Sequence, residues 1–165
     1  MKKYILFFTL WFAIMTYLQA QSVSYTYRPF ADEGCFVTYT PSFIGDTAYI
    51  VVNIRSDRLV FNDNPIMMVR FFNTDQIIQL NGKKLDATSN DGAILVGNVL
   101  VPFSEVKAMA MFKVSEQEME LFKCGVERIR LSTFPITHDR TFHKDKIGIP
   151  LYMDYQIAKQ KAQNF

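Results

Sequence analysis

The sequence predicts a mainly β protein with sandwich-like antiparallel sheets, one short inserted helix and a C-terminal helix. Aromatic residues make up 15% of the 165 residues, and together with many β-branched residues they favour strands. Short apolar segments alternate with turn sequences along most of the chain, which is typical of stacked antiparallel sheets. Two stretches in the second half have helical signals instead. An α+β arrangement is the alternative, because a helix between two strands can also connect parallel neighbours.

The first 20 residues have the pattern of a secretory signal peptide. Two lysines precede an apolar segment, Ile5–Leu18, which is shorter than the roughly 20 residues that span a bilayer. Ala20 is a small residue directly before the expected cleavage at Gln21. The residue three before the cut is a leucine, larger than usual there, so an uncleaved anchor is the alternative reading.

Removal of this signal leaves residues 21–165, which we predict to form a single β-rich domain that is periplasmic or secreted. The signal holds two of the 18 basic residues and none of the 16 acidic ones, so the remaining chain has a formal net charge of zero. A neutral chain gives no reason to expect nucleic acid as a partner. No later segment is long and apolar enough to predict a membrane span.

Strands are expected at Cys35–Thr40, which Pro41 ends, and at Thr47–Arg55 and Ile66–Phe72. In Thr47–Arg55 one face is expected to be buried and holds Ala48, Ile50, Val52 and Ile54, while Asn53 and Arg55 fall on the other face at the end of the strand.

Turn sequences divide the middle of the chain. Asn81-Gly82 has the residues of a two-residue hairpin turn between Ile77–Leu80 and Lys83–Leu85. Ser89–Gly92 has turn chemistry as well. The segment that follows, Ala93–Val101, is largely apolar and ends at Pro102.

The best-defined local unit is a strand, a helix and a strand. Lys107–Val114 alternates like a strand, and Ser115 with Glu118 forms a capping box that starts a short helix. Gly125 suits the end of that helix. Val126–Ser132 then predicts a strand with Ile129 and Leu131 inward and with Arg128 and Arg130 outward. The last helix is expected after Pro150, with Leu151, Tyr155, Ala158 and Ala162 packed on the sheet; a partner-binding helix is the alternative.

The stretch Met111–Leu131, and more loosely Phe142–Gly148, resembles a pattern in small exported proteins of Gram-negative anaerobes. The shared part is a strand, a capped helix and a "Gly-Val-x-x-Ile-Arg" strand. Most such proteins are domains of unknown function. The resemblance covers about a third of residues 21–165 and implies export and a β-rich fold, but no active site.

Two cysteines, Cys35 and Cys124, allow one disulfide outside the cytoplasm; two separate thiols are the alternative. A nucleophilic Cys124 would need His138 or His143 beside it. The end of a helix raises a thiol's pKa, however, and so argues against that role.

A metal site is a hypothesis for the group of His138, Asp139, His143 and Asp145, whose side chains only a loop could bring together. The stretch Asp86–Gly92 lacks the ligand spacing of a calcium loop. Carboxylates also cluster in sequence, at Asp32, Glu33, Glu116, Glu118 and Glu120.

Three arginines, Arg70, Arg128 and Arg130, could share one basic face of the sheet, with a solvated surface as the ordinary reading. No catalytic, cofactor or metal residues are assigned. The sequence favours a non-enzymatic exported domain that binds another envelope or extracellular macromolecule or has a structural role. A small hydrolase with a carboxylate or Cys-His site and a small-molecule carrier are the alternatives; the ligand and the oligomeric state are not predicted.

Overall fold

The computed structural model describes residues 22–30, 33–74, 76–96 and 99–163. The predicted signal peptide lies outside these residues, and so does Asp32. The strands are β1 (Val23–Phe30), β2 (Glu33–Ile44), β3 (Thr47–Ser56), β4 (Val60–Phe61), β5 (Ile66–Phe71), β6 (Ile77–Val96), β7 (Val99–Val114), β8 (Val126–Leu131), β9 (Thr133–Phe134) and β10 (His138–Thr141). The helices are α2 (Glu116–Leu121), the 3-10 turn η2 (Phe122–Cys124) and α3 (Gly148–Gln163).

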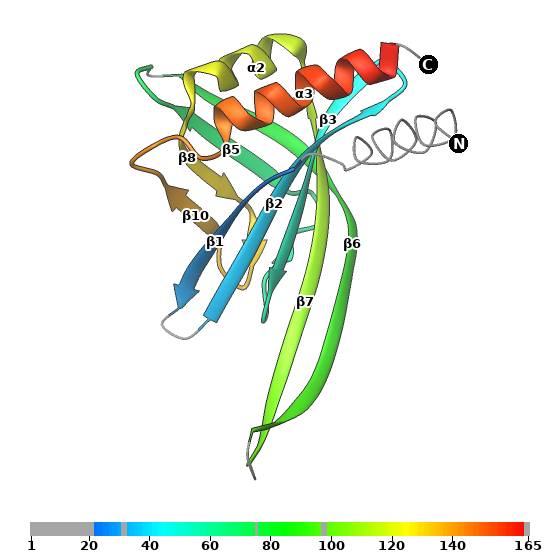
Figure 1. Cartoon of the computed structure of the whole chain (residues 1–165), viewed down its shortest axis with the longest axis vertical. Coiled ribbons are helices and arrows are strands. Elements are labelled where there is room, and N and C mark those ends of the chain that lie inside the picture. The colour runs from blue at the N-terminus through cyan, green and yellow to red at the C-terminus, as the bar shows by residue number, and fades with distance from the viewer. Residues whose placement is uncertain (1–21, 31–32, 75, 97–98, 164–165) are drawn as a thin grey trace, which may run out of the picture.

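Eight of the strands form one sheet in the order β1-β2-β3-β7-β6-β5-β8-β10, and every described pair is antiparallel. Strands β4 and β9 pair separately. The sheet curls until its two edge strands approach each other (Figure 1). Tyr25 on β1 and His138 on β10 are joined there by a hydrogen bond of 2.6 Å. The mainly β prediction, with antiparallel sheet, inserted helix and C-terminal helix, is confirmed.

The core lies inside the curl, where alternate residues of the strands are buried. In β3 the predicted inward residues Ala48, Ile50, Val52 and Ile54 are all buried, so the predicted face is confirmed. Burying apolar surface in this way contributes roughly 25 cal/mol per Å². The helices α2 and α3 cover one end of the curl, and α3 packs on β2 and η2 (Figure 1).

The predicted hairpin at Asn81-Gly82 is wrong, because β6 runs through it without a turn. Strand β6 pairs with β5 as far as Asn81 and with β7 from Gly82 onward, so this is where the strand changes partner. A Cβ atom on Gly82 would lie 2.6 Å from the ring of Phe112. Gly82 therefore allows the backbone of β6 to approach the Phe112 ring closely. Close approach of this kind is, besides turns, a reason for glycine in a strand.

The predicted turn at Ser89–Gly92 is also wrong. These residues continue β6, and Ser89 pairs with Val106 on β7. The chain reverses only between Val96 and Val99, which divides the predicted Ala93–Val101 segment between two strands. The continuous ladder with β7 holds the polar residues extended, and this pairing outweighs their local turn preference.

Strand β2 passes through Pro41, where the sequence predicts an end. Pro41 pairs with Ile50 on β3, whereas the pairs with the described part of β1 reach no further than Tyr39. A proline lacks a backbone N–H and is tolerated where one side of a strand is an edge. Pro41 occupies such a position.

The strand–helix–strand unit is confirmed. Glu118 N–H donates to the Ser115 side chain, and the Glu118 carboxylate accepts from Ser115 N–H at 2.7 Å, which completes the capping box. Gly125 follows η2 with a φ of 77°. An N-cap serine such as Ser115 stabilises a helix by about 1 kcal/mol.

The carboxylate of Asp145 holds the start of α3 against the start of β8. Its Oδ1 accepts from Val126 N–H at 2.9 Å and from Gly148 N–H at 2.7 Å, and its Oδ2 accepts from Ile149 N–H at 2.8 Å. Helix α3 starts at Gly148, slightly before the predicted point. It buries Leu151 and Tyr155 as expected, whereas Ala158 is half-buried and Ala162, predicted on the same face, is exposed.

Candidate binding surfaces

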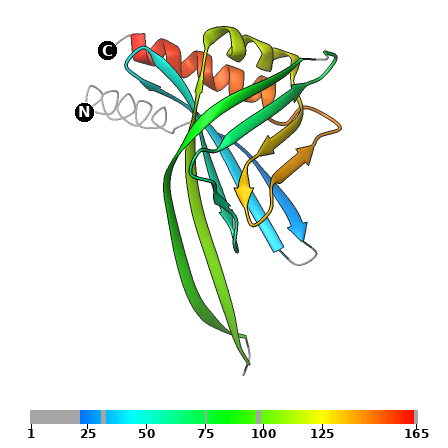
Figure 2. The same ribbon diagram turned by 180° about the vertical axis from the view of Figure 1, so that it is seen from behind.

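The ends of β6 and β7 form a protruding two-stranded ribbon, which we call the arm (residues 88–96 and 99–106). Beyond Ser56 and its partner Val106, β7 no longer pairs with β3, so the two strands of the arm pair only with each other among the described strands. Figures 1 and 2 show from opposite sides that the arm extends well past the other strands. Every residue from Leu85 to Ala93 is exposed. Since successive residues alternate between faces, neither face of this part of the ribbon is covered.

The outer part of the arm has a strongly apolar sequence. It comprises Ala93, Ile94, Leu95, Val96, Val99, Leu100, Val101, Pro102 and Phe103. This run lacks the period of two that marks a strand with one buried and one solvated face. The register pairs Leu95 with Leu100 and Ile94 with Val101. The arm therefore combines an exposed polar stem with an outer end whose sequence is typical of residues that are buried.

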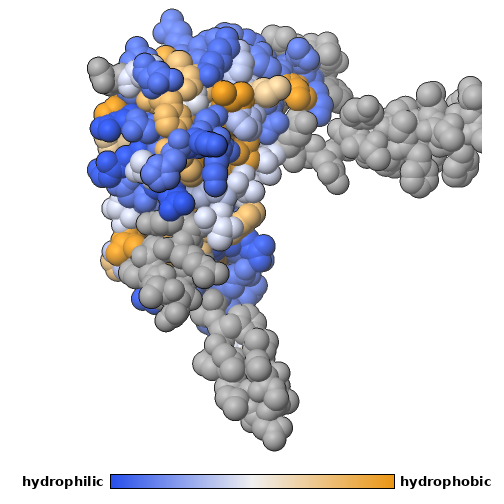
Figure 3. All heavy atoms as spheres, turned by 60° about the vertical axis from the view of Figure 1, so that its left-hand side comes forward, coloured by the Kyte–Doolittle hydropathy of each residue, from blue (hydrophilic) through white to orange (hydrophobic). Residues whose placement is uncertain are grey.

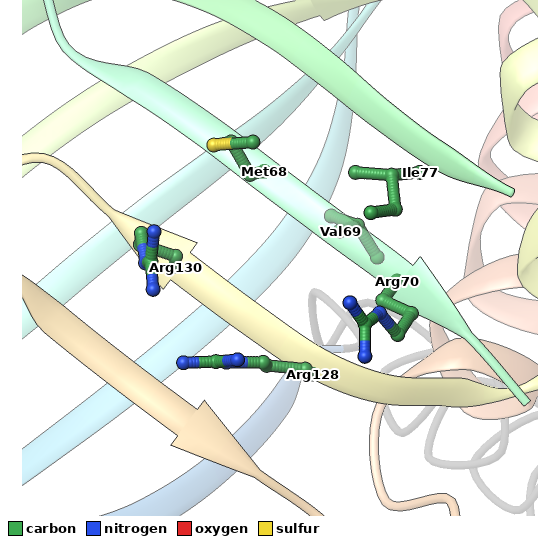
Figure 4. Close-up of a pocket in the computed structure, with 6 residues that line it drawn as sticks. All are labelled: Met68, Val69, Arg70, Ile77, Arg128 and Arg130. Carbon is green, nitrogen blue, oxygen red and sulfur yellow. The ribbon is translucent and has the colours of Figure 1, made fainter. Parts of the chain in front are cut away.

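A second surface feature is a shallow hollow on the outer face of β5 and β8, which we call the arginine groove. Its volume is about 80 Å³. Figure 4 shows its lining residues, three from β5, one from β6 and two from β8: Met68, Val69, Arg70, Ile77, Arg128 and Arg130. The register explains this grouping, because Arg70 lies opposite Arg128 and Met68 lies opposite Arg130. The predicted common basic face is thus formed.

One carboxylate serves two of the three arginines. Asp139 accepts two hydrogen bonds from Arg128, at 2.8 and 2.7 Å, and two from Arg130 at the same distances. The hydrogen bond from Arg128, followed by that from Arg130, lowers the pKa of Asp139 although partial burial opposes this. Within the described residues, no carboxylate lies within ion-pair distance of Arg70.

Figure 3 brings the β8–β10 side of the molecule forward, and its surface is largely hydrophilic with scattered apolar residues. Scattered apolar residues are normal on a protein surface.

The residues of the metal hypothesis are separated by their contacts. His138 is fully buried and is bonded to Tyr25, whose hydroxyl lies 3.0 Å from that of Tyr39. Burial lowers the pKa of His138 to about 4. Asp139 binds the two arginines, Asp145 caps α3, and His143 is exposed. Among the described residues, no group of three His, Cys, Asp or Glu side chains could hold a metal ion.

Both cysteines are free thiols, so the structure contains no Cys35–Cys124 disulfide. Cys35 is buried, and this burial, with a smaller effect of Asp57, raises its pKa to about 12. Such a thiol is a poor nucleophile. Cys124 is exposed at the end of η2, whereas His138 is in the core.

The clustered carboxylates of α2 also have structural partners. Glu116 pairs with Lys159 on α3, and Glu120 pairs with Lys123 and accepts from the Tyr152 hydroxyl at 2.9 Å. Asp86, from the calcium-like stretch, lies in β6 and accepts from the next backbone N–H. These contacts explain the acids without catalysis.

Two further surfaces were not predicted. Helix α3 exposes Ile149, Met153 and Ile157, one turn apart, on the side away from Leu151. Ile149, Met153 and Ile157 recur every four residues, and this second apolar period in the helix is the sequence signal that could have revealed the exposed face. A larger hollow of about 250 Å³ lies between α3 and the β2–β3 turn, with Asp46, Lys113, Glu116 and Lys159 in its lining.

No protein-family model and no curated protein matches this chain. The resemblance to exported proteins of Gram-negative anaerobes therefore stays a prediction. Of the helices in the described residues, none combines the length and the apolar character needed to cross a membrane.

Proposed function

We propose that the chain is an exported, non-enzymatic binding domain that attaches through its arm to another macromolecule of the envelope or the extracellular space. The observation that supports this most is the arm itself. It adds a long two-stranded ribbon to the body, its stem is exposed from Thr88 to Ala93, and its outer end has the sequence composition of a protein core.

An isolated two-stranded ribbon is only marginally stable in water. An apolar ribbon exposed to water also loses the free energy that burial would supply, and its open edges invite pairing with further strands. A partner protein that covers the outer arm and pairs with one edge would remove both costs. Strand addition of this kind is a known mode of recognition.

Export is supported by the sequence of residues 1–20 alone. The domain would then meet its partner outside the cytoplasm. N-terminal sequencing of the protein from a fractionated source culture tests this part: a start at Gln21 outside the cytoplasm is expected, and an intact start at Met1 in the cytoplasm would contradict it.

The hydrolase and carrier alternatives have less support. Cys35 and His138 are buried, Glu116 and Glu120 of α2 form ion pairs, and Glu118 caps the helix, so these groups already have structural roles. A carrier would need a dry apolar cavity, whereas the larger of the hollows above has charged residues in its lining.

The arm hypothesis is tested by site-specific photo-cross-linking in the source organism. A photoreactive residue at Ala93 in the arm is compared with one at Thr141 on β10, which is also exposed. We expect one discrete adduct from Ala93 and none from Thr141. The adduct should also disappear when Ser89–Val106 is replaced by an Asn-Gly turn and the cross-linker is moved to Thr88.

Equal adducts from both positions, or no adduct from Ala93 at native expression, would contradict the proposal. Replacing Asn90 by serine provides a matched control, because this change leaves the arm length and its apolar end unaltered and should leave the adduct unaffected.

A further inference from the structure

We propose that the arginine groove binds the phosphate group of an organic phosphate monoester. This inference is independent of the proposed role of the arm, since it rests on side chains of β5, β6, β8 and β10.

The first argument is charge. Arg70, Arg128 and Arg130 bring three positive charges to adjacent positions of two neighbouring strands, and the carboxylate in direct contact with them is that of Asp139. An excess of two positive charges results. Like charges directly opposite each other on neighbouring strands, as Arg70 and Arg128 are, destabilise a sheet. A dianion in the groove would remove this repulsion.

The second argument is the supply of donors. Arg128 and Arg130 each contact Asp139 through Nε and Nη2, so the Nη1 group of each does not take part in these bonds. Arg70 forms no ion pair with a described residue, which leaves its whole planar fork of N–H donors to a ligand. A phosphate monoester has three terminal oxygens and a charge near −2 at neutral pH, and guanidinium forks bind it well.

The third argument is shape. The groove offers about 80 Å³, several times the roughly 10–15 Å³ that one water molecule needs on the same measure. Met68 and Ile77 lie beside the arginines in Figure 4 and give the hollow an apolar margin. This apolar margin would contact the organic group of a phosphate monoester. Inorganic phosphate has no organic group and would lack this contact.

The test is calorimetric titration at low salt with phenyl phosphate, inorganic phosphate and benzoate, together with NMR of the arginine Nε–H signals. We expect phenyl phosphate to bind most tightly, inorganic phosphate several-fold more weakly and the monoanion benzoate weakest. The Nε–H signal of Arg70 should shift on binding. Affinity should fall as salt is raised.

Substitutions separate the groove from general charge. Arg70→Gln should weaken phenyl phosphate binding about tenfold or more, because it removes a charged donor fork. Arg55→Gln makes the same change of net charge on β3, where Arg55 contacts Glu105, and should leave binding unchanged. Asp139→Asn should tighten binding several-fold, a gain that misfolding cannot produce.

Three results would overturn the proposal: no saturable binding of phenyl phosphate, equal losses for Arg70→Gln and Arg55→Gln, or weaker binding by Asp139→Asn. Equal affinities for phenyl phosphate and inorganic phosphate would replace the monoester by free phosphate as the ligand. Repeating the titration with the variant that lacks the arm should give the same affinity, so that failure of one proposal does not affect the other.

Discussion

Strands β6 and β7 differ sharply between their two halves. In the body, Ala108, Ala110, Phe112 and Val114 of β7 are buried at every second position. In the arm, the same ladder continues, but Thr88 to Ala93 of β6 are all exposed. The two strands pair in the same way in both halves. Backbone pairing alone therefore does not determine whether apolar or polar residues occupy a strand.

Burial makes the difference. A residue in the body is selected for its fit to the core. The arm residues Thr88 to Ala93 are instead exposed, and Glu105 of the arm meets the body through a surface ion pair with Arg55. The stability of the fold should therefore depend on the body half of each strand, and binding should depend on the arm half. Four predictions test this division, beginning with the largest effect.

Removing one buried ring should be the most damaging change. Phe112→Ala should lower the free energy of unfolding by about 3–5 kcal/mol, because it leaves a cavity against Gly82 and against Phe61, whose ring centroid is 6.1 Å away. Leu85→Ala, at an exposed position of the neighbouring strand, should change it by less than about 0.5 kcal/mol. Urea denaturation measures both, and equal effects would remove the distinction between buried and exposed positions of the two strands.

Acid should weaken the body through His138. Its pKa is about 4 in the fold because of burial, while nearby Asp139 raises and Arg140 lowers it to smaller extents. An unfolded histidine titrates near 6.5, so the unfolded chain binds the proton first as the pH falls. The contribution of the neutral His138 to the free energy of unfolding should be fully present above pH 6.5. The free energy of unfolding should then decline by about 3 kcal/mol towards pH 4.

The comparison for this second prediction is His138→Gln, whose unfolding free energy should be lower at neutral pH and should lack most of that decline. A wild-type decline that persists in the variant would show that another group is responsible.

Loss of the Asp145 carboxylate should have an intermediate effect. Asp145→Ala removes the acceptor for the backbone of both α3 and β8 and should cost about 2 kcal/mol. Asp63→Ala is the control, since the Asp63 side chain is 95% exposed and should contribute almost nothing. Thermal unfolding followed by circular dichroism compares the two variants. Similar unfolding midpoints would show that the Asp145 hydrogen bonds between α3 and β8 do not stabilise the fold.

Deleting the arm should have the smallest effect on stability. Replacing Ser89–Val106 by Asn-Gly should change the free energy of unfolding by less than about 1 kcal/mol, because Ser89 to Ala93 are exposed and the Arg55–Glu105 ion pair that is lost lies at the surface. Urea denaturation with the m-value is the measurement. A loss comparable to that of Phe112→Ala would mean that the arm is part of the core.

The sequence was most informative where local and tertiary demands agree. The capping box at Ser115, the alternation in β3 and the outward arginines of β8 are each determined by short-range chemistry or by a period of two, and each was predicted correctly. The two false turns share one cause: Gly82 and Ser89–Gly92 have turn residues, but strand pairing with β7 determines their conformation.

The arginine groove was only half predictable. The outward direction of Arg128 and Arg130 follows from alternation, but the presence of Arg70 beside them depends on which strands are neighbours. Likewise, nothing in the local sequence shows that Asp139 joins two arginines or that Asp145 caps a helix; both depend on how β10 and α3 pack.

Strand β6 also has a mechanical consequence. It carries Ile77 at the margin of the arginine groove and continues without a break to Val96 near the end of the arm. The stretch beyond Gly82 is about 45 Å long at the usual rise of a strand, so a tilt of about 5° at its base displaces the far end by about 4 Å. A small rotation of the sheet beside the arginine groove therefore produces a larger displacement at the far end of the arm.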